Sequence, residues 1–189
     1  MPDYALSEIF RTFPFFWGKD AYLCDMQPQV ITLRTSAEGD IAAVDQLLSQ
    51  SYSRLLRADY PPSVQVTAIP IIARANPSLI TSGRYYLAVD QDDQVLGAGG
   101  WSRSIKGGQV ADIRHVVTDY RHQRRGIARR IMMAIISEAR QAGVTRLDCL
   151  STRTARRFYG AMGFETLGAI TVALRPGIEF PAIRMQRSL

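Results

Sequence analysis

The chain has 189 residues, with 23 basic and 17 acidic side chains and a formal charge of +6 at neutral pH, which is the size of one ordinary domain. Its apolar runs are far shorter than the ~20 residues of a membrane-spanning helix, and its two cysteines and two histidines match neither a disulfide framework nor a metal-binding pattern. Because the N-terminal residues do not resemble a secretion signal, we expect a cytoplasmic protein without a membrane span or a metal.

Residues 1–29 differ from the rest of the chain. They contain seven aromatic side chains and three prolines, which interrupt any regular periodicity. We interpret this stretch as an aromatic-rich N-terminal extension, which either folds back on its own domain or covers a partner subunit. Residues 30–189 are predicted to form the main domain.

Apolar periodicity divides residues 30–189 into short strands and helices. In chain order these are a strand at 30–34, a helix at 41–52, broken helical turns at 64–80, strands at 84–90, 95–102 and 110–118, a helix at 126–142, a strand at 144–150, a helix at 152–162, and strands at 165–174 and 182–187. This order predicts an α/β fold with a mixed sheet and hairpins in its middle, which a purely doubly wound parallel fold would not contain.

Most of the net charge lies between Arg114 and Arg130. This stretch of 17 residues contains six arginines and one acidic residue, Asp119, so it supplies +5 of the total of +6. Such a cluster indicates a polyanionic partner, either a nucleic acid or a phosphorylated cofactor.

The cluster coincides with a junction between a predicted strand and the longest predicted helix. The first turn of a helix has unpaired N–H groups and a partial positive charge, which together bind phosphate. Gly126 allows a ligand to approach the backbone closely, or allows a positive φ. The small side chain of Ala128 leaves room for a ligand beside the amides. The junction therefore favours a bound diphosphate, although a solvated basic helix start is the alternative.

Two motifs resemble those of the GNAT superfamily of acyl-CoA-dependent N-acyltransferases. The first is Gln123-x-x-Gly126-x-Ala128 after an apolar strand, and the second is Ala155-x-x-Phe158-Tyr159 followed by Gly163-Phe164. The resemblance covers residues 30–189. It implies an N-acetyltransferase domain with a central mixed, twisted sheet of about seven strands flanked by helices.

The resemblance also implies acetyl-CoA, or coenzyme A, as co-substrate. Backbone groups of one strand would pair with the pantetheine arm, and the amides of the following junction would bind the pyrophosphate. The matching positions are Val116, Val117, Thr118, Gln123, Arg124, Arg125, Gly126, Ile127, Ala128, Arg129, Thr152 and Phe158. Thr152 stands where many members have asparagine, which leaves this contact open. Coenzyme A would account for the basic cluster without a nucleic acid.

Two residues are the predicted catalytic groups. Tyr159 matches the tyrosine that often serves as general acid toward the coenzyme A sulfur; a core aromatic residue with a hydrogen-bonded hydroxyl is the alternative. Asp112 is the candidate base, acting through water, and an ion pair with Arg114 is its alternative. Strand alternation places His115 on the face opposite Asp112, which makes His115 the weaker candidate.

The acceptor pocket in this family is usually built from the first helical connection and the last hairpin. Here these are residues 57–81 and 175–181, whose carboxylates are Asp59 and Glu179, with Trp101 as the floor. The predicted function is direct transfer of acetyl from acetyl-CoA to a primary amine of a small molecule or peptide in a ternary complex. A non-catalytic acyl-CoA sensor and a basic nucleic-acid-binding module are the alternatives. We expect no nucleic acid or membrane as partner, and a homodimer is a candidate assembly.

Overall fold

The computed structural model describes residues 30–105 and 107–189. The predicted extension at 1–29 lies outside the described residues. The strands are β1 (Thr32–Thr35), β2 (Tyr85–Val89), β3 (Val95–Arg103), β4 (Val110–Thr118), β5 (Arg146–Ser151), β6 (Glu165–Arg175) and β7 (Ile178–Ser188). The α-helices are α1 (Ile41–Leu55), α2 (Pro62–Thr67), α3 (Ile69–Ile72), α4 (Pro77–Ile80), α5 (Ile127–Gln141) and α6 (Arg156–Ala161).

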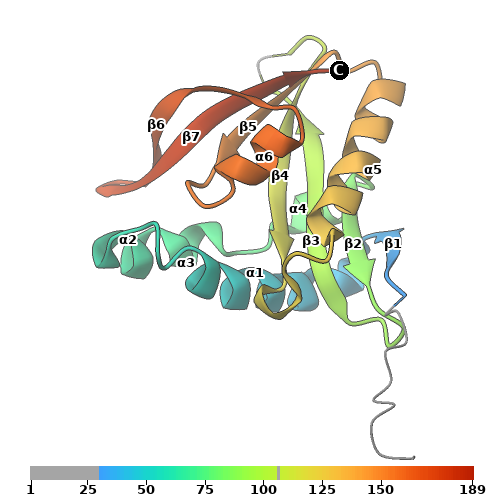
Figure 1. The fold of residues 1–189 in the computed structure, drawn as a ribbon, viewed down its shortest axis with the longest axis horizontal. Coiled ribbons are helices and arrows are strands. Elements are labelled where there is room, and N and C mark those ends of the chain that lie inside the picture. The colour runs from blue at the N-terminus through green and yellow to red at the C-terminus, as the bar shows by residue number, and fades with distance from the viewer. Residues whose placement is uncertain (1–29, 106) are drawn as a thin grey trace, which may run out of the picture.

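The seven strands form one sheet in the order β1-β2-β3-β4-β5-β7-β6 (Figure 1). Every neighbouring pair is antiparallel except β4 and β5, which are parallel. The predicted mixed sheet of about seven strands is confirmed. The largest differences in length from the prediction are in α6, which is shorter because residues 152–155 precede it as a turn, and in β7, which is longer and extends the β6–β7 hairpin.

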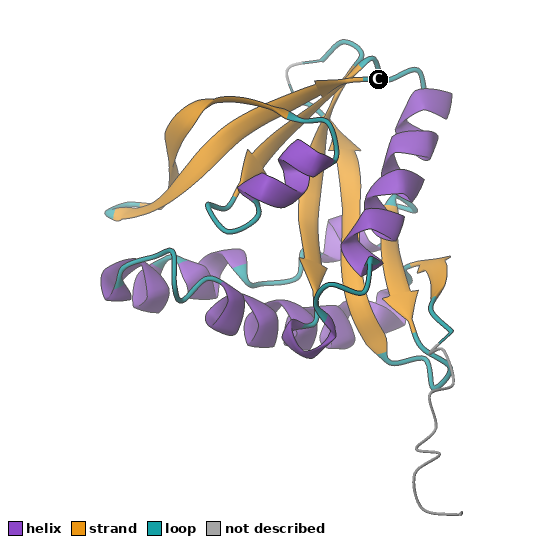
Figure 2. Cartoon of the chain, in the orientation of Figure 1, coloured by secondary structure: helices purple, strands orange, loops and turns teal. Residues whose placement is uncertain are grey.

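Helices cover both faces of the sheet (Figure 2). Helices α5 and α6 pack on one face, around a core that includes Ile131, Leu147 and Phe164. On the other face, α1 and α4 pack on β2 and β3, and α2 and α3 pack on the β6–β7 hairpin through Ile69 and Phe180. In the described ranges, no helix combines the length and apolar character that crossing a membrane requires.

Helix α5 follows its sequence pattern closely. Ile127, Ile131 and Ile135 recur every fourth residue and are at most 1% exposed, so they form one stripe against the sheet. Full burial of such a side chain is worth about 1.5–3 kcal/mol. Gly143 follows the helix with φ 74°, the left-handed conformation that commonly ends helices. Long, strongly periodic segments of this kind are predicted well from sequence.

Trp101 does not form the floor of an acceptor pocket, so that expectation is wrong. Its side chain is fully buried in the α5 face of the sheet. Its indole N–H donates to Oε2 of Glu138 on α5 at 2.6 Å, and the hydroxyl of Tyr86 donates to the same oxygen at 2.6 Å. The indole nitrogen needs a partner when it is buried, and Glu138 provides one on the side away from α1–α3.

We expect Gly100→Ala to destabilise the fold by about 1–3 kcal/mol, as overpacking of a core usually does. A Cβ at Gly100 would lie 2.6 Å from Cδ2 and 2.9 Å from Cα of Tyr85, with the carbonyl oxygen of Arg84 closer still. The control is Gly39→Ala, because a Cβ at Gly39 meets no atom within 4 Å. Urea unfolding of both variants measures the effect, and equal midpoints would contradict the expected overpacking.

Candidate active site

Strands β4 and β5 begin side by side and then separate. They pair only from Val110 with Arg146 to Asp112 with Asp148, although β4 continues to Thr118. Over residues 113–118, no described strand pairs with the β5-facing edge of β4. Backbone groups at such an edge remain available to an extended ligand. The predicted pantetheine-binding residues Val116, Val117 and Thr118 lie in this segment.

A β-bulge on β4 accompanies the separation. Gly99 of β3 faces two residues of β4, His115 and Val116, where the register shifts. His115 has φ 45°, and its carbonyl oxygen accepts a hydrogen bond from the Tyr85 hydroxyl at 3.3 Å. Because a bulge re-aims side chains, the consecutive residues Arg114 and His115 line the same pocket. Strict alternation therefore does not determine the face of β4 on which His115 lies.

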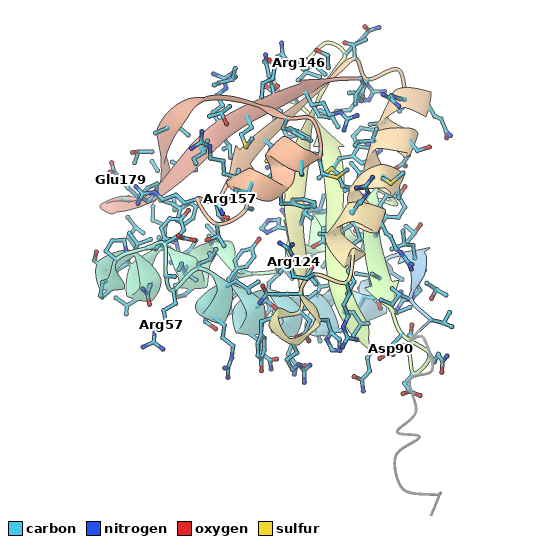
Figure 3. All side chains as sticks on the ribbon, viewed as in Figure 1. Arg57, Asp90, Arg124, Arg146, Arg157 and Glu179 are labelled. Carbon is cyan, nitrogen blue, oxygen red and sulfur yellow. The ribbon has the colours of Figure 1, made fainter. Side chains whose placement is uncertain are left out.

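The start of α5 has the backbone geometry of an anion-binding turn. Gly126 is the N-cap residue with φ 76°, and Arg124 also has a positive φ, of 63°. Positive φ at a non-glycine residue is uncommon and is often found at functional sites. A Cβ at Gly126 would meet no atom within 4 Å, so the backbone at this position is open to a ligand. This turn fits a diphosphate, and Figure 3 labels Arg124 beside it.

The predicted arginine cluster is divided in the structure. Three members donate hydrogen bonds within the protein: Arg114 to Ser102 at 2.9 Å, Arg121 to Asp119 at 2.8 Å, and Arg130 to the carbonyl oxygen of Ile31 at 3.1 Å. Arg124, Arg125 and Arg129 flank the first turn of α5 by their position in the chain. The charge available at the helix start is therefore smaller than the sequence count suggests.

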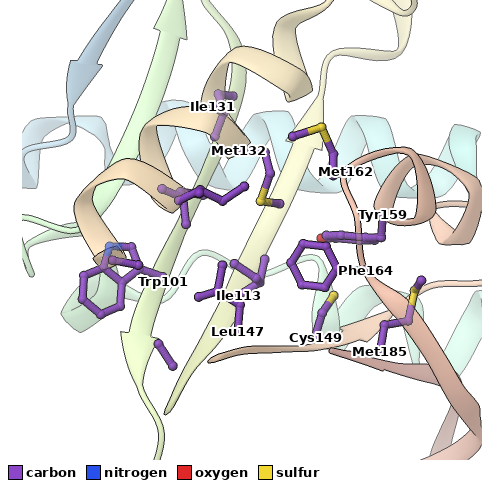
Figure 4. Close-up of a cluster of buried hydrophobic side chains, with 14 of the residues drawn as sticks. Trp101, Ile113, Ile131, Met132, Leu147, Cys149, Tyr159, Met162, Phe164 and Met185 are labelled. Carbon is purple, nitrogen blue, oxygen red and sulfur yellow. The ribbon is translucent and has the colours of Figure 1, made fainter. Parts of the chain in front are cut away.

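Tyr159 lies in the core at the point where β4 and β5 separate (Figure 4). Its ring packs edge-on against Phe158 and Phe164, with ring centroids 5.2 and 5.3 Å apart. Its hydroxyl shares a hydrogen bond with the thiol of Cys149, the first β5 residue beyond the last pair with β4. Burial raises the pKa of Tyr159 well above its ordinary value. The hydroxyl therefore keeps its proton at neutral pH, as a general acid must.

Tyr52 on α1 is a site residue that the sequence did not identify. It lines the pocket beside the separated strands, and it lies close enough to Cys149 and Tyr159 to interact with both electrostatically. Burial raises its pKa above the ordinary tyrosine value. Its position in the apolar stripe of α1 is typical of a core residue. The tyrosine hydroxyl was the only feature of the sequence that could have indicated a role in the site.

A pocket of about 210 Å³ opens beside the separated strands. Its sheet side is formed by Ile113, Arg114, His115 and Leu150, together with Thr152 after β5. The predicted cofactor contact Thr152 thus borders the pocket, whereas Phe158 is partly buried and packs against Tyr159 at the edge of the core.

The two predicted loop segments contribute one residue each to this pocket, Ile72 and Phe180. The carboxylates of these segments, Asp59 and Glu179, do not line this pocket. Asp59 accepts a hydrogen bond from Thr154. Glu179 is exposed near the start of β7, close to the tip of the β6–β7 hairpin (Figure 3).

Asp112 lies next to this pocket but not in it. Its carboxylate lines an adjoining pocket of about 290 Å³, and its Oδ2 is 3.7 Å from Nη2 of Arg114. This position is compatible with the predicted ion pair. A role as base toward a group beside His115 would require an intervening water.

The stability of the fold is expected to decrease as the pH falls from 7.5 to 5.5. Burial, and then the charge of Arg114, lower the pKa of His115, so the unfolded chain binds this proton more readily than the folded chain. The stabilisation is therefore present above the ordinary histidine pKa of about 6.5 and is lost as the pH falls through the folded-state pKa. Asp40 and Asp119, whose pKa values are also lowered, titrate below this window.

Urea unfolding at pH 7.5 and 5.5 measures this effect, with His115→Gln as the comparison. The substitution is expected to reduce the difference between the two pH values. An unchanged difference would assign the pH dependence to other groups.

The sequence matches the model of one protein family, described as the acetyltransferase (GNAT) domain, over residues 64–187. This range contains β2 to β6, most of β7 and the junction before α5. A search among functionally curated proteins finds no similar sequence.

Solved structures with the same fold include several N-acetyltransferases. A GCN5-related N-acetyltransferase from Rhodopseudomonas palustris has 18% identity and a TM-score of 0.70, over 84% of this chain and 95% of that one. The PaiA N-acetyltransferase from Thermoplasma acidophilum, in complex with coenzyme A, has 12% identity and a TM-score of 0.68, over 85% and 99%. N-acetylglutamate synthase from Neisseria gonorrhoeae, with coenzyme A and L-arginine, has 18% identity and a TM-score of 0.58, over 85% and 34%.

Proposed function

Because this chain belongs to the GNAT acetyltransferase family and is an acyltransferase, we propose that it transfers an acetyl group from acetyl-CoA to a primary amine. The observation that carries this proposal is the separation of β4 from β5 next to the start of α5. One extended ligand with a diphosphate can use both features, and two of the similar structures contain coenzyme A.

The cofactor is proposed to bind along the free edge of β4. Val116, Val117 and Thr118 supply backbone groups to the pantetheine arm, and Thr152 borders the same opening. The first-turn amides of α5, from Gly126 to Ala128, bind the diphosphate, helped by the partial positive charge of the helix. Gln123, Arg124, Arg125 and Arg129 surround this turn. Phe158 supports the site indirectly, through its packing on Tyr159.

The chemistry is proposed to be direct attack of the amine nitrogen on the thioester carbon, with loss of the thiolate. A backbone N–H in the β4 bulge donates to the thioester oxygen as negative charge develops there. Tyr159 donates its hydroxyl proton to the departing sulfur, which its place at the strand separation favours. Asp112 accepts the proton released by the amine through a water molecule, because its carboxylate lies in the adjoining pocket.

The assay that tests this function monitors thiol released from acetyl-CoA against a library of small amines and peptides. We expect at least one acceptor to give saturable, enzyme-dependent release and an acetylated product by mass spectrometry. Binding of acetyl-CoA without turnover of any acceptor would favour the sensor alternative. We further propose a cytoplasmic location, where acetyl-CoA is available; size-exclusion chromatography with light scattering would test the homodimer.

A further inference from the structure

The two sides of the pocket beside the separated strands differ in polarity. The side away from β4 and β5 is apolar except for one tyrosine hydroxyl, and it consists of Tyr52, Ile72, Val172, Leu174, Phe180 and Ala182. Among the described residues that line this pocket, Arg114 carries the only fixed charge, because the lowered pKa of His115 keeps its imidazole neutral at pH 7. The pocket therefore combines an apolar wall with one cation.

The guanidinium of Arg114 is oriented and still able to bind a ligand. Its Nε donates to Oγ of Ser102 at 2.9 Å, which restrains the plane of the group. The nearest carboxylate oxygen, of Asp112, is 3.7 Å from Nη2 and thus beyond hydrogen-bond distance. The terminal N–H groups can therefore form the paired, charge-assisted hydrogen bonds that arginine makes with a carboxylate.

The neighbouring acidic side chains do not turn the pocket into a site for a simple cation. Asp112 and Asp148 line the adjoining pocket, which also contains Arg184. Asp148 accepts a hydrogen bond from Arg146 at 2.9 Å. Within the pocket itself a simple alkylammonium ion would meet Arg114 and no carboxylate, since Asp112 lines the adjoining pocket, and like charges at this range repel.

We propose that the acceptor is an apolar α-amino acid, whose carboxylate pairs with Arg114 and whose side chain contacts the apolar wall. This inference rests on the proposed function. Arg114 immediately precedes the bulge at His115 and Val116, where the thioester carbonyl is proposed to lie, so an acceptor with few atoms between its anion and its reacting amine suits this pocket. An α-amino acid meets this condition.

Two further observations agree with this acceptor. A cavity of about 150 Å³ is known to hold benzene, so about 210 Å³ suits one amino-acid side chain better than a peptide. In addition, the positive charge of Arg114 favours the neutral form of a nearby amine, which is the form that attacks the thioester.

The test compares each amino acid with the amine that lacks only its carboxylate. Leucine is paired with isoamylamine and phenylalanine with phenethylamine, and kcat/KM is measured with the full chain and acetyl-CoA by thiol release. We expect the amino acid to be preferred by about 100-fold or more, because a site built for a polar group rejects analogues that lack it. Arg114→Gln is expected to remove most of this preference, and Arg114→Lys to restore part of it.

Arg103→Gln is the matched control, since Arg103 is exposed on β3 and donates to the carbonyl oxygen of Ala142 at 2.8 Å, away from the pocket. It should keep the preference of the unmodified protein. Titration with acetyl-CoA verifies that each variant is folded and binds the cofactor.

Equal use of each amino acid and its amine, preference for the amines, or no acetylation of either amino acid would overturn the acceptor inference. If acetyl-CoA binds and only carboxylate-free amines react, the inference fails while the proposed function stands. If acetyl-CoA does not bind to the unmodified protein, the proposed function itself fails.

Discussion

Replacing Tyr159 by phenylalanine is expected to lower the rate of acetyl transfer by about 10²- to 10⁴-fold, the usual contribution of a general acid. The variant keeps the ring contacts with Phe158 and Phe164 and loses only the hydroxyl. Loss of its hydrogen bond to Cys149 should destabilise the fold by about 1 kcal/mol. Affinity for acetyl-CoA should change little, so the effect should appear in kcat.

Tyr86→Phe is the matched control for this prediction. It also removes a hydrogen-bonded tyrosine hydroxyl, the one that donates to Glu138 at 2.6 Å, but at a site under α5. We expect a comparable loss of stability and unchanged kcat. Steady-state thiol release and urea unfolding of both variants separate the two effects. Full turnover by the Tyr159→Phe protein would remove the general-acid assignment and leave Tyr159 as a core residue.

Replacing Gly126 by valine is expected to weaken acetyl-CoA binding by at least ~100-fold, which corresponds to about 2.7 kcal/mol. The new side chain would occupy open space at the N-cap of α5, beside the amides where the diphosphate is proposed to bind. It would also strain the backbone, because Gly126 has φ 76° and left-handed φ is unfavourable for a β-branched residue by roughly 1–2 kcal/mol.

The control for this backbone strain is Gly143→Val, at the other end of the same helix. Gly143 has φ 74°, and a Cβ added there would meet no atom within 4 Å, as at Gly126. The two variants should therefore lose similar stability, while only Gly126→Val loses affinity in isothermal titration. Equal affinities would show that the start of α5 is not the diphosphate site.

The fold was largely predictable because its signals are local, and the signals for the proposed cofactor site are local as well. The apolar stripe of α5, the glycines at its two ends and the two motifs each lie within one short segment. The mixed character of the sheet followed from the alternation of elements, since a parallel pair such as β4–β5 needs the crossover helix between its strands. The bulge at His115 was not predictable, because no glycine or turn residue marks it; it is set by the pairing of β4 with β3.

The pocket beside the separated strands was less predictable because its residues come from distant parts of the chain. Tyr52, Ile113 and Leu174 meet only after α1, β4 and β6 have packed together. The number of arginines between residues 114 and 130 overestimated the charge at the start of α5 for a related reason. Arg114, Arg121 and Arg130 are close in sequence, but their guanidinium groups bond to different elements of the fold, so sequence proximity overstated the charge at one point.

The central claim is that the separation of β4 from β5 and the start of α5 form one acetyl-CoA site. Isothermal titration of the unmodified chain with acetyl-CoA tests it most directly. We predict saturable binding with one ligand per chain, and strong weakening by Gly126→Val. The absence of heat at high micromolar acetyl-CoA, confirmed by a thermal-unfolding midpoint that does not shift with ligand, would contradict the claim.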